Sequence, residues 1–350
     1  MEERQCGSAN LQLSALGMGC WSHGGGDYWG ESDQNEVNHV VRRAVELGIN
    51  YFDTAEMYEG GRSEEALGQA IRDLPREDVV IGSKVWPDHC YHDTLIEHCE
   101  ASLQRLGLDH LDLYMLHWPI HPRSIRHLTK NEAVINNPPT IDEALEALGT
   151  LKTQGKVRHI GVSNFAVPRL DEARGLCDGI VANQLPYSLI TRAIEYETLP
   201  HCRDNGVGII GYMSLCQGML ADLFATLDDV PVWQRRTRHF DHKKCDMCRH
   251  GSDGAETETE QALADIRAIA TESGMSMAEI SIKWAIANPA ITTALVGMRT
   301  VAKLEANVEC ANNPLPIDLV EKLNAATAAL KETLGPSFDY YDSVANDRTV

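Results

Sequence analysis

The chain has 350 residues, of which 43% are hydrophobic and 23% charged, with 27 Gly and 14 Pro. This globular composition excludes a disordered, collagen-like or coiled-coil protein. The formal net charge of −20 would repel a phosphate backbone, so we expect no nucleic-acid partner.

The sequence also gives expectations about location. It has no run of 18 apolar residues, so no membrane span is expected, and the first residues, Met-Glu-Glu-Arg-Gln-Cys, lack the apolar core of a signal peptide. We therefore expect a soluble, cytoplasmic protein. In that setting most of the ten Cys should be reduced and packed as small hydrophobes.

In chain order, short β-branched runs alternate with amphipathic stretches. Eight runs predict strands, and several are almost continuously apolar, as strands buried on both faces should be: Ala15–Trp21, Tyr51–Ala55, Val79–Val85, Leu111–His117, His159–Val162, Ile180–Gln184, Gly208–Tyr212 and Thr293–Gly297. Amphipathic patterns predict helices over Ser32–Leu47, Ser63–Arg72, Thr94–Leu106, Thr140–Gln154, Ala262–Ser273 and Ala278–Ala287. This alternation favours an α/β fold, a (β/α)8 TIM barrel, as one domain over residues 1–350.

Two intervals between predicted strands are longer than a normal βα unit. Residues 119–139 hold four prolines and little helical pattern, and residues 220–260 are polar. Both follow the C-terminal end of a strand, the face on which barrel enzymes carry their chemistry. We expect these enlarged loops to be lids or substrate walls, with disordered surface loops as the alternative. The tail, residues 331–350, either folds back over the barrel mouth or is disordered.

Three consecutive predicted strands end in polar residues, namely Asp53, Lys84 and His117. Buried strands carry such groups only when these are paired, and the strand ends should bring them together with Tyr58. Lys84 would lower the pKa of Tyr58, which suits a group that protonates a carbonyl oxygen during hydride transfer. Asp53 would balance Lys84, and His117 would donate to the substrate oxygen. The alternative interpretation is a structural one, a buried ion pair and a core histidine. It would account for any one of these residues alone, but it accounts less readily for all four at successive strand ends.

These motifs resemble the aldo-keto reductase superfamily. The catalytic tetrad motifs of that family are similar to three segments of this chain: Phe52-Asp53-Thr54-Ala55 with Tyr58, Lys84 in Gly-Ser-Lys, and His117 in Leu-His-Trp-Pro. Residues 155–165 are similar to a further signature of the family. The resemblance runs from about Ser14 to Leu330. It implies a (β/α)8 barrel that reduces carbonyls with NADPH.

The resemblance also implies the cofactor site. Ser163, Asn164 and Gln184 would hold the carboxamide, and the Tyr212 ring would stack on the nicotinamide, although plain core packing also explains Tyr212. Arg299 and Lys303 would grip a 2′-phosphate, which favours NADP(H) over NAD(H), whereas the alternative for both is a solvated helix face. The full implied set is Gly19, Cys20, Trp21, Asp53, Ser163, Asn164, Gln184, Tyr212, Ser214, Leu215, Gln217, Gly218, Gly297, Arg299, Lys303 and Asn307.

Aromatic residues at the strand ends suggest the substrate wall. Trp21, Trp86 and Trp118 are the candidates, and Trp29 and Tyr187 are possible additions; such walls suit an aromatic aldehyde or the apolar face of a sugar. The predicted function is an NADP(H)-dependent oxidoreductase for an aldehyde, ketone or sugar, with Tyr58 as general acid/base and an oligomer possible. The alternative is a nucleotide-binding regulatory or redox-sensing protein on the same barrel with little turnover.

One cysteine pair, Cys245 and Cys248, stands apart within the second long loop, flanked by His239, His242 and His250. The pattern is compatible with a zinc site or a redox switch. A second CxxC is absent, however, and a single one is a weak signal. We therefore expect free thiols and no metal at this pair.

Overall fold

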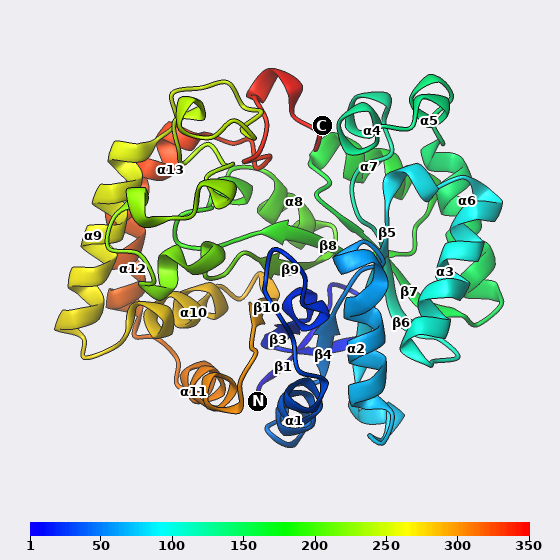
Figure 1. The fold of residues 1–350 in the computed structure, drawn as a ribbon, viewed down its shortest axis with the longest axis horizontal. Coiled ribbons are helices and arrows are strands. Elements are labelled where there is room, and N and C mark those ends of the chain that lie inside the picture. The colour runs from blue at the N-terminus through cyan, green and yellow to red at the C-terminus, as the bar shows by residue number, and fades with distance from the viewer.

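The computed structural model describes residues 1–350 and contains a closed barrel of eight parallel strands (Figure 1). This confirms the predicted (β/α)8 barrel. Each predicted strand belongs to the barrel, with ends that differ by a few residues. The barrel strands are β3 (Leu16–Gly19), β4 (Tyr51–Asp53), β5 (Val80–Val85), β6 (Leu111–Leu116), β7 (Val157–Ser163), β8 (Ile180–Pro186), β9 (Gly208–Tyr212) and β10 (Ile291–Gly297), and β10 pairs with β3 to close the ring.

A short antiparallel hairpin, β1 (Glu3–Gln5) and β2 (Gln12–Ser14), precedes the barrel. Its apolar residues Cys6, Leu11 and Leu13 pack with barrel-interior side chains such as Tyr51 and Leu113. The hairpin leads directly into β3, so it lies at the N-terminal end of the barrel and leaves the opposite end free for the site. The sequence did not predict this hairpin, because each strand has only three residues and β1 is largely polar.

Helices surround the strands and bury a large outer core between helix and barrel. The predicted helices are all present, but the one predicted to begin at Ala262 begins six residues earlier, at Glu256. The helices are α1 (Gln34–Glu46), α2 (Arg62–Ile71), α3 (His92–Leu106), α4 (Pro122–Leu128), α5 (Glu132–Asn136), α6 (Ile141–Thr153), α7 (Val167–Leu176), α8 (Thr198–Asp204), α9 (Glu256–Glu272), α10 (Met277–Ala287), α11 (Val301–Asn312), α12 (Ile317–Ala326) and α13 (Ala328–Leu334).

The first long loop differs from its prediction. Residues 119–139 contain α4 and α5, although their sequence shows little helical pattern. Pro122 stands at the first position of α4, where a missing N–H costs nothing, and His121 and Asn131 accept hydrogen bonds from the backbone at the starts of the two helices. Capping residues at the helix starts, rather than an amphipathic pattern, therefore indicate these two helices.

The second long loop lies beside the C-terminal tail, as the yellow-green and red segments of Figure 1 show. The backbone N–H of Arg238 donates to the Tyr340 carbonyl at 2.7 Å, and its guanidinium donates to the Leu334 carbonyl at 2.7 Å. At the other end of the tail, the Thr349 carbonyl accepts a hydrogen bond from Ala166, which follows β7. The tail is thus packed across the loops at the C-terminal ends of the strands.

None of the helices combines the length and the apolar character that crossing a bilayer requires. The cytoplasmic location inferred from the sequence stays a prediction.

Candidate active site

The four polar residues singled out in the sequence come together at the C-terminal end of the barrel. Asp53 ends β4, Lys84 lies near the end of β5, and His117 directly follows β6. The ammonium of Lys84 lies 2.8 Å from Asp53 Oδ2, 2.7 Å from the carbonyl of Thr54 and 3.2 Å from Tyr58 Oη. Lys84 has no exposed surface, and these three acceptors satisfy its three donors.

Asp53 is fixed from inside the barrel as well. Its Oδ1 accepts hydrogen bonds from Gln184 Nε2 at 2.7 Å and from Tyr51 Oη at 3.3 Å. Burial acts to lower the pKa of Lys84, but Asp53 and Tyr58 raise it above 10.5. The lysine is therefore a permanent cation at neutral pH.

The expected pKa shift of Tyr58 is wrong in direction. Burial raises the pKa of Tyr58 above its ordinary value of 10, and the opposing charge of Lys84 does not overcome this. The hydroxyl lies within the mouth, where desolvation penalises the phenolate. Tyr58 therefore holds its proton throughout the neutral range.

His117 completes the group. Its ring stands edge-on to Tyr58 and to Trp86, with ring centroids 5.7 and 5.1 Å apart. Burial, together with the charge of Lys84, holds the pKa of His117 well below 6.5, so the imidazole is neutral and has one N–H to donate. Its buried Nδ1 has no partner in the protein.

The predicted tryptophans take different positions around these four residues. Trp21 stacks on Tyr58, with centroids 5.4 Å apart, and its ring also stacks on Tyr28. Trp118 lies against the tail instead, with the Arg348 guanidinium 4.2 Å from its ring centroid. Tyr28 and Arg348 were missed in the sequence. A visible signal for Tyr28 was its place beside Trp29 within the glycine-rich loop Gly24–Gly30.

Tyr187 does not join this wall. Its ring is buried against Trp284 of α10, with centroids 4.9 Å apart. Its hydroxyl hydrogen-bonds with Glu195 and Asn288. Tyr187 is therefore a packing residue between barrel and helix.

The residues implied for the carboxamide lie beside Asp53 and bond to one another. Asn164, in a left-handed conformation with φ 65°, donates to the His117 carbonyl at 3.0 Å and accepts from Tyr212 Oη at 2.7 Å. Ser163 Oγ donates to the Gln184 carbonyl at 3.0 Å. The structure thus brings Ser163, Asn164, Gln184 and Tyr212 into one polar group next to the four residues.

The remaining implied cofactor residues include groups suited to a polar ligand. Ser214 Oγ is buried without a partner, as is Ser22 Oγ beside Trp21. Gly19 and Gly297 pair across β3 and β10, and a Cβ on either would meet nothing closer than 3.9 Å, which leaves room there. Of the other implied cofactor residues, Cys20 is buried and Leu215 is half-buried. The amide of Gln217, just before Gly218, donates to Tyr341 Oη at 3.4 Å.

The implied phosphate end lies at the start of α11, directly after β10. Thr300 caps this helix by accepting from the Lys303 backbone N–H. The side chain of Lys303 is exposed and has no protein partner, and Asn307 is half-buried on the same helix. Arg299, however, donates to the carbonyls of Trp29, at 2.6 Å, and Glu31, so its guanidinium ties down the glycine-rich loop.

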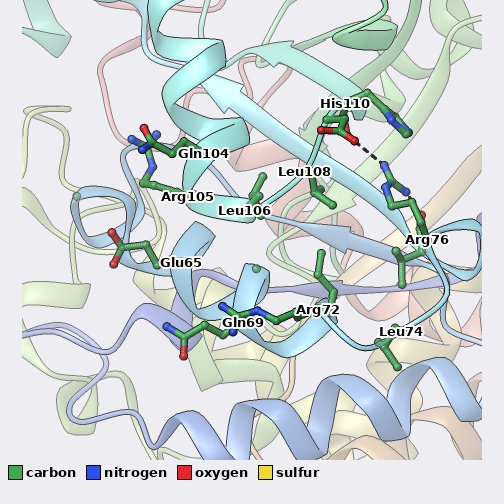
Figure 2. A pocket seen from close by; sticks show the side chains of 16 residues that line it. Glu65, Gln69, Arg72, Leu74, Arg76, Gln104, Arg105, Leu106, Leu108 and His110 are labelled. Atoms are coloured by element: carbon green, nitrogen blue, oxygen red, sulfur yellow. Dashed lines mark hydrogen bonds between the residues drawn. The ribbon is translucent and has the colours of Figure 1, made fainter.

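One cavity lies away from these residues. It measures about 850 Å³, sits beside α2 and α3, and is lined by polar side chains such as Arg72 and Arg76 (Figure 2). Arg76 there donates to the His110 carbonyl at 3.2 Å. None of the four active-site candidates lines this cavity, so it is separate from the candidate active site.

The cysteine pair has no set of metal ligands around it. All ten cysteines are free, and Cys248 Sγ contacts the Arg235 carbonyl at 2.9 Å. The flanking imidazoles of His239, His242 and His250 bond to carbonyls or hydroxyls instead. Burial, with a contribution from Cys245, raises the pKa of Cys248 to about 12, so its thiol is protonated at neutral pH.

Comparisons with known proteins identify relatives of this chain. The model of the Aldo/keto reductase family matches residues 15–328. The chain is 28% identical to the aldo-keto reductase YhdN of Bacillus subtilis over 97% of each chain. It is 35% identical to the NADH-specific methylglyoxal reductase of Escherichia coli over 68% of this chain and 74% of that protein. A solved aldo/keto reductase from Klebsiella pneumoniae, in complex with NADP and acetate, is 25% identical with a TM-score of 0.70, over 98% and 100% of the two chains.

Proposed function

Because the chain belongs to the aldo/keto reductase family, we propose that it is an NADP(H)-dependent carbonyl reductase in which Tyr58 is the proton donor. The observation that carries the proposal is the buried chain of contacts from Asp53 through Lys84 to Tyr58. A structural ion pair would not need a tyrosine hydroxyl held at the barrel mouth by the same ammonium.

The nicotinamide cofactor, when bound, would supply the hydride to the carbonyl carbon. Tyr58 Oη gives its proton to the carbonyl oxygen, and Lys84, 3.2 Å away, stabilises the phenolate that remains. Asp53 holds Lys84 in place and balances its charge. Neutral His117 donates a hydrogen bond that orients the substrate oxygen.

The residues present fit a dinucleotide along the mouth. Ser163, Asn164, Gln184 and Tyr212 would hold the nicotinamide end, and the partnerless hydroxyl of Ser214 offers a hydrogen bond along the way. The exposed Lys303 on α11 suits the 2′-phosphate that distinguishes NADP(H) from NAD(H). Arg299, whose guanidinium is held by the carbonyls of Trp29 and Glu31, adds positive charge just before the same helix. One relative is NADH-specific and one structural neighbour binds NADP, so our choice of NADP(H) depends on these two cations.

For the substrate we propose a small 2-oxoaldehyde first, because a relative 35% identical to this chain is a methylglyoxal reductase. Trp21 and Trp86, beside Tyr58 and His117, give apolar walls that also suit aromatic aldehydes and the apolar faces of sugars. An assay panel therefore begins with methylglyoxal and continues with aromatic aldehydes and keto sugars.

The test is the variant Tyr58→Phe. We expect kcat for NADPH-dependent reduction to fall roughly 10²–10⁴-fold, the usual contribution of general acid catalysis, while the Kd for NADPH stays within about twofold because the phenyl ring still stacks on Trp21. Tyr196→Phe, at an exposed position on the barrel exterior, is the matched control and should keep wild-type kcat. A near-normal kcat in Tyr58→Phe contradicts the proposal. Tight NADPH binding without turnover on any substrate supports the regulatory alternative.

The cofactor preference has its own test in Lys303→Ala. Removal of one charged hydrogen bond to a phosphate should raise the KM for NADPH about tenfold and leave the KM for NADH unchanged. Lys322→Ala, which removes an exposed lysine paired with Glu272 far from the site, is the control. Equal effects on both cofactors would remove Lys303 from the phosphate site.

A further inference from the structure

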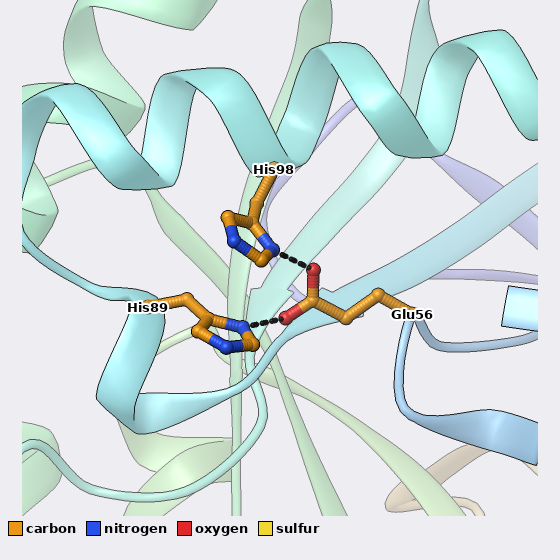
Figure 3. Close-up of side chains that lie close together, drawn as sticks. All are labelled: Glu56, His89 and His98. Carbon is orange, nitrogen blue, oxygen red and sulfur yellow. Dashed lines mark hydrogen bonds and ion pairs between the residues drawn. The ribbon is translucent and has the colours of Figure 1, made fainter. Parts of the chain in front are cut away.

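Three side chains converge next to the active site without belonging to it. Glu56 lies in the turn between Asp53 and Tyr58, His89 ends a short 3-10 helix (Pro87–His89) after β5, and His98 lies on α3. We call them the Glu56 cluster (Figure 3). Glu56 Oε1 lies 2.8 Å from His89 Nδ1, Glu56 Oε2 lies 2.6 Å from His98 Nδ1, and the two imidazoles stack with centroids 3.8 Å apart.

The carboxylate in this cluster has no permanent cation. Glu56 is 6% exposed, and its only ion-pair partners are the two histidines; its one further donor is the backbone N–H of Trp86, at 2.8 Å. Burial raises the pKa of Glu56, but the hydrogen bonds from the two imidazoles and from Trp86 together lower it to about 2. A buried anion of this kind is stabilised by a positive charge. Burial opposes the charged form of His89, but Glu56 raises the pKa of this imidazole above its ordinary value, so the histidine and any bound cation would compete for the same carboxylate.

We propose that the Glu56 cluster is a binding site for a divalent transition-metal ion such as Zn²⁺, held by a carboxylate oxygen of Glu56 and by Nδ1 of His89 and His98. Two histidines and one glutamate, with water as the fourth ligand, form a donor set that zinc accepts. The three ligand atoms already lie within 4.8 Å of one another. Tetrahedral bonds of about 2.0–2.1 Å would need them about 3.4 Å apart, so small side-chain rotations suffice.

Access and charge both favour the ion. The side chains of His89 and His98 are 29% and 33% exposed, so an ion and its water ligand can enter from solvent. Asp88, whose Oδ1 lies 3.4 Å from His89 Nε2, can orient that ring from its far side, as second ligand shells commonly do. The ion would place a permanent positive charge beside the buried carboxylate.

A second trio, Asp241, His242 and Asp253, does not support the same inference. It lies in the second long loop and is more exposed. Lys243 Nζ already pairs with Asp253 at 2.8 Å, and Asp241 accepts the backbone N–H of Lys243 as a helix cap. The carboxylates there already have a cation and a structural role.

The position of the Glu56 cluster links it to the active-site turn. Glu56 is two residues before Tyr58. It also accepts a hydrogen bond from the backbone N–H of Trp86, whose ring stands edge-on to His117. A bound ion would therefore hold the turn that carries Tyr58 to α3. The proposal does not depend on the reductase activity, because binding is measured without substrate or cofactor.

The test uses the full chain after chelator treatment, with Zn²⁺ titrated calorimetrically near pH 7.5. We expect one ion per chain, and an affinity at least about 100-fold lower in His98→Ala, since loss of even an outer-shell partner costs 10–100-fold. His92→Ala, on the same helix and outside the cluster, is the matched control and should bind as the wild type does. Co²⁺ should give a tetrahedral spectrum without a thiolate charge-transfer band.

Three outcomes would overturn the site: no Zn²⁺ binding by the wild type, equal binding by His98→Ala and the wild type, or binding lost in Cys245→Ser with Cys248→Ser but kept in His98→Ala. Circular dichroism checks the fold of each variant, and His89→Ala replaces His98→Ala if that variant unfolds. If neither folds, the Co²⁺ spectrum of the wild type decides, because a thiolate band or an octahedral spectrum excludes this ligand set.

Discussion

Lys84 is charged and fully buried, and its neighbours offset the cost of that burial. Asp53 supplies the opposite charge, and Thr54 and Tyr58 complete the hydrogen bonds. Loss of one partner from such a pair leaves an uncompensated charge. The same lysine is therefore both a structural anchor for β4 and β5 and the group that stabilises a phenolate at Tyr58.

The pKa directions at these residues predict the pH dependence of the reaction. Reduction needs Tyr58 protonated, and the pKa of Tyr58 lies above 10, whereas His117 is already neutral because its pKa lies well below 6.5. The rate of reduction should therefore be flat between about pH 6 and 9 and fall only as Tyr58 loses its proton. Alcohol oxidation, which needs the phenolate as base, should rise with pH over the same range.

The measurement is kcat/KM in both directions across that range, with Tyr58→Phe as the reference that lacks the ionising group. A reduction rate that falls between pH 7 and 9 would place the pKa of Tyr58 below 10. A limb near pH 6.5 that disappears in His117→Asn would show that the imidazole titrates in the neutral range.

The sequence predicted that these residues would converge, but it did not predict the direction of the pKa shift of Tyr58. Asp53, Lys84 and His117 were visible because each is a polar residue at the end of an apolar strand. The pKa of Tyr58 was not, because it depends on how deeply the folded chain buries this residue. Arg299 was likewise visible as a cation, but its bonds to the carbonyls of Trp29 and Glu31 join segments about 270 residues apart.

At the level of elements, helices α2 and α3 meet at Gly68. A Cβ there would lie 2.6 Å from the carbonyl oxygen of Leu106 and 2.7 Å from that of Arg105. The two helices therefore approach closely because this residue has no side chain. In most helix interiors a glycine is destabilising by roughly 0.5–1 kcal/mol relative to alanine, so its presence here reflects packing.

Gly68→Ala should lower the free energy of unfolding by about 1–3 kcal/mol, because the methyl group overpacks the contact. Gly149→Ala is the matched control: it lies within α6, and a Cβ there meets nothing within 4 Å. That change should instead raise the free energy of unfolding by roughly 0.5–1 kcal/mol. Urea unfolding of both variants measures the difference, and equal effects would contradict a close contact at Gly68.

The elements that the sequence missed share a physical reason. The barrel strands were predictable because residues such as those of β6 are buried without interruption. Helix α12 buries only one of its residues, so it has little apolar stripe to detect. The hairpin β1–β2 is short, and its apolar residues are recognisable only once the barrel-interior side chains that they pack against are known.

At the level of the whole molecule, the C-terminal tail joins segments that are distant in the chain. Arg348 binds both oxygens of Asp339, at 2.7 and 2.6 Å, and both side chains are buried. The same guanidinium covers Trp118, which follows His117. The sequence allowed a tail folded over the mouth but could not choose it, because one arginine and one aspartate near a terminus look the same in a disordered segment.

Arg348→Ala should therefore cost more than an ordinary surface charge. It leaves Asp339 buried without its cation, a loss of about 3–5 kcal/mol in the free energy of unfolding, and it frees one face of Trp118. Arg203→Ala, which removes an exposed pair with Asp204, should cost less than about 1 kcal/mol. Urea unfolding followed by tryptophan fluorescence compares the two. Equal stability losses in both variants would mean that the pair of Arg348 with Asp339 does not stabilise the fold. If the tail also forms a wall of the substrate site, KM for the carbonyl substrate will rise in Arg348→Ala with little change in kcat.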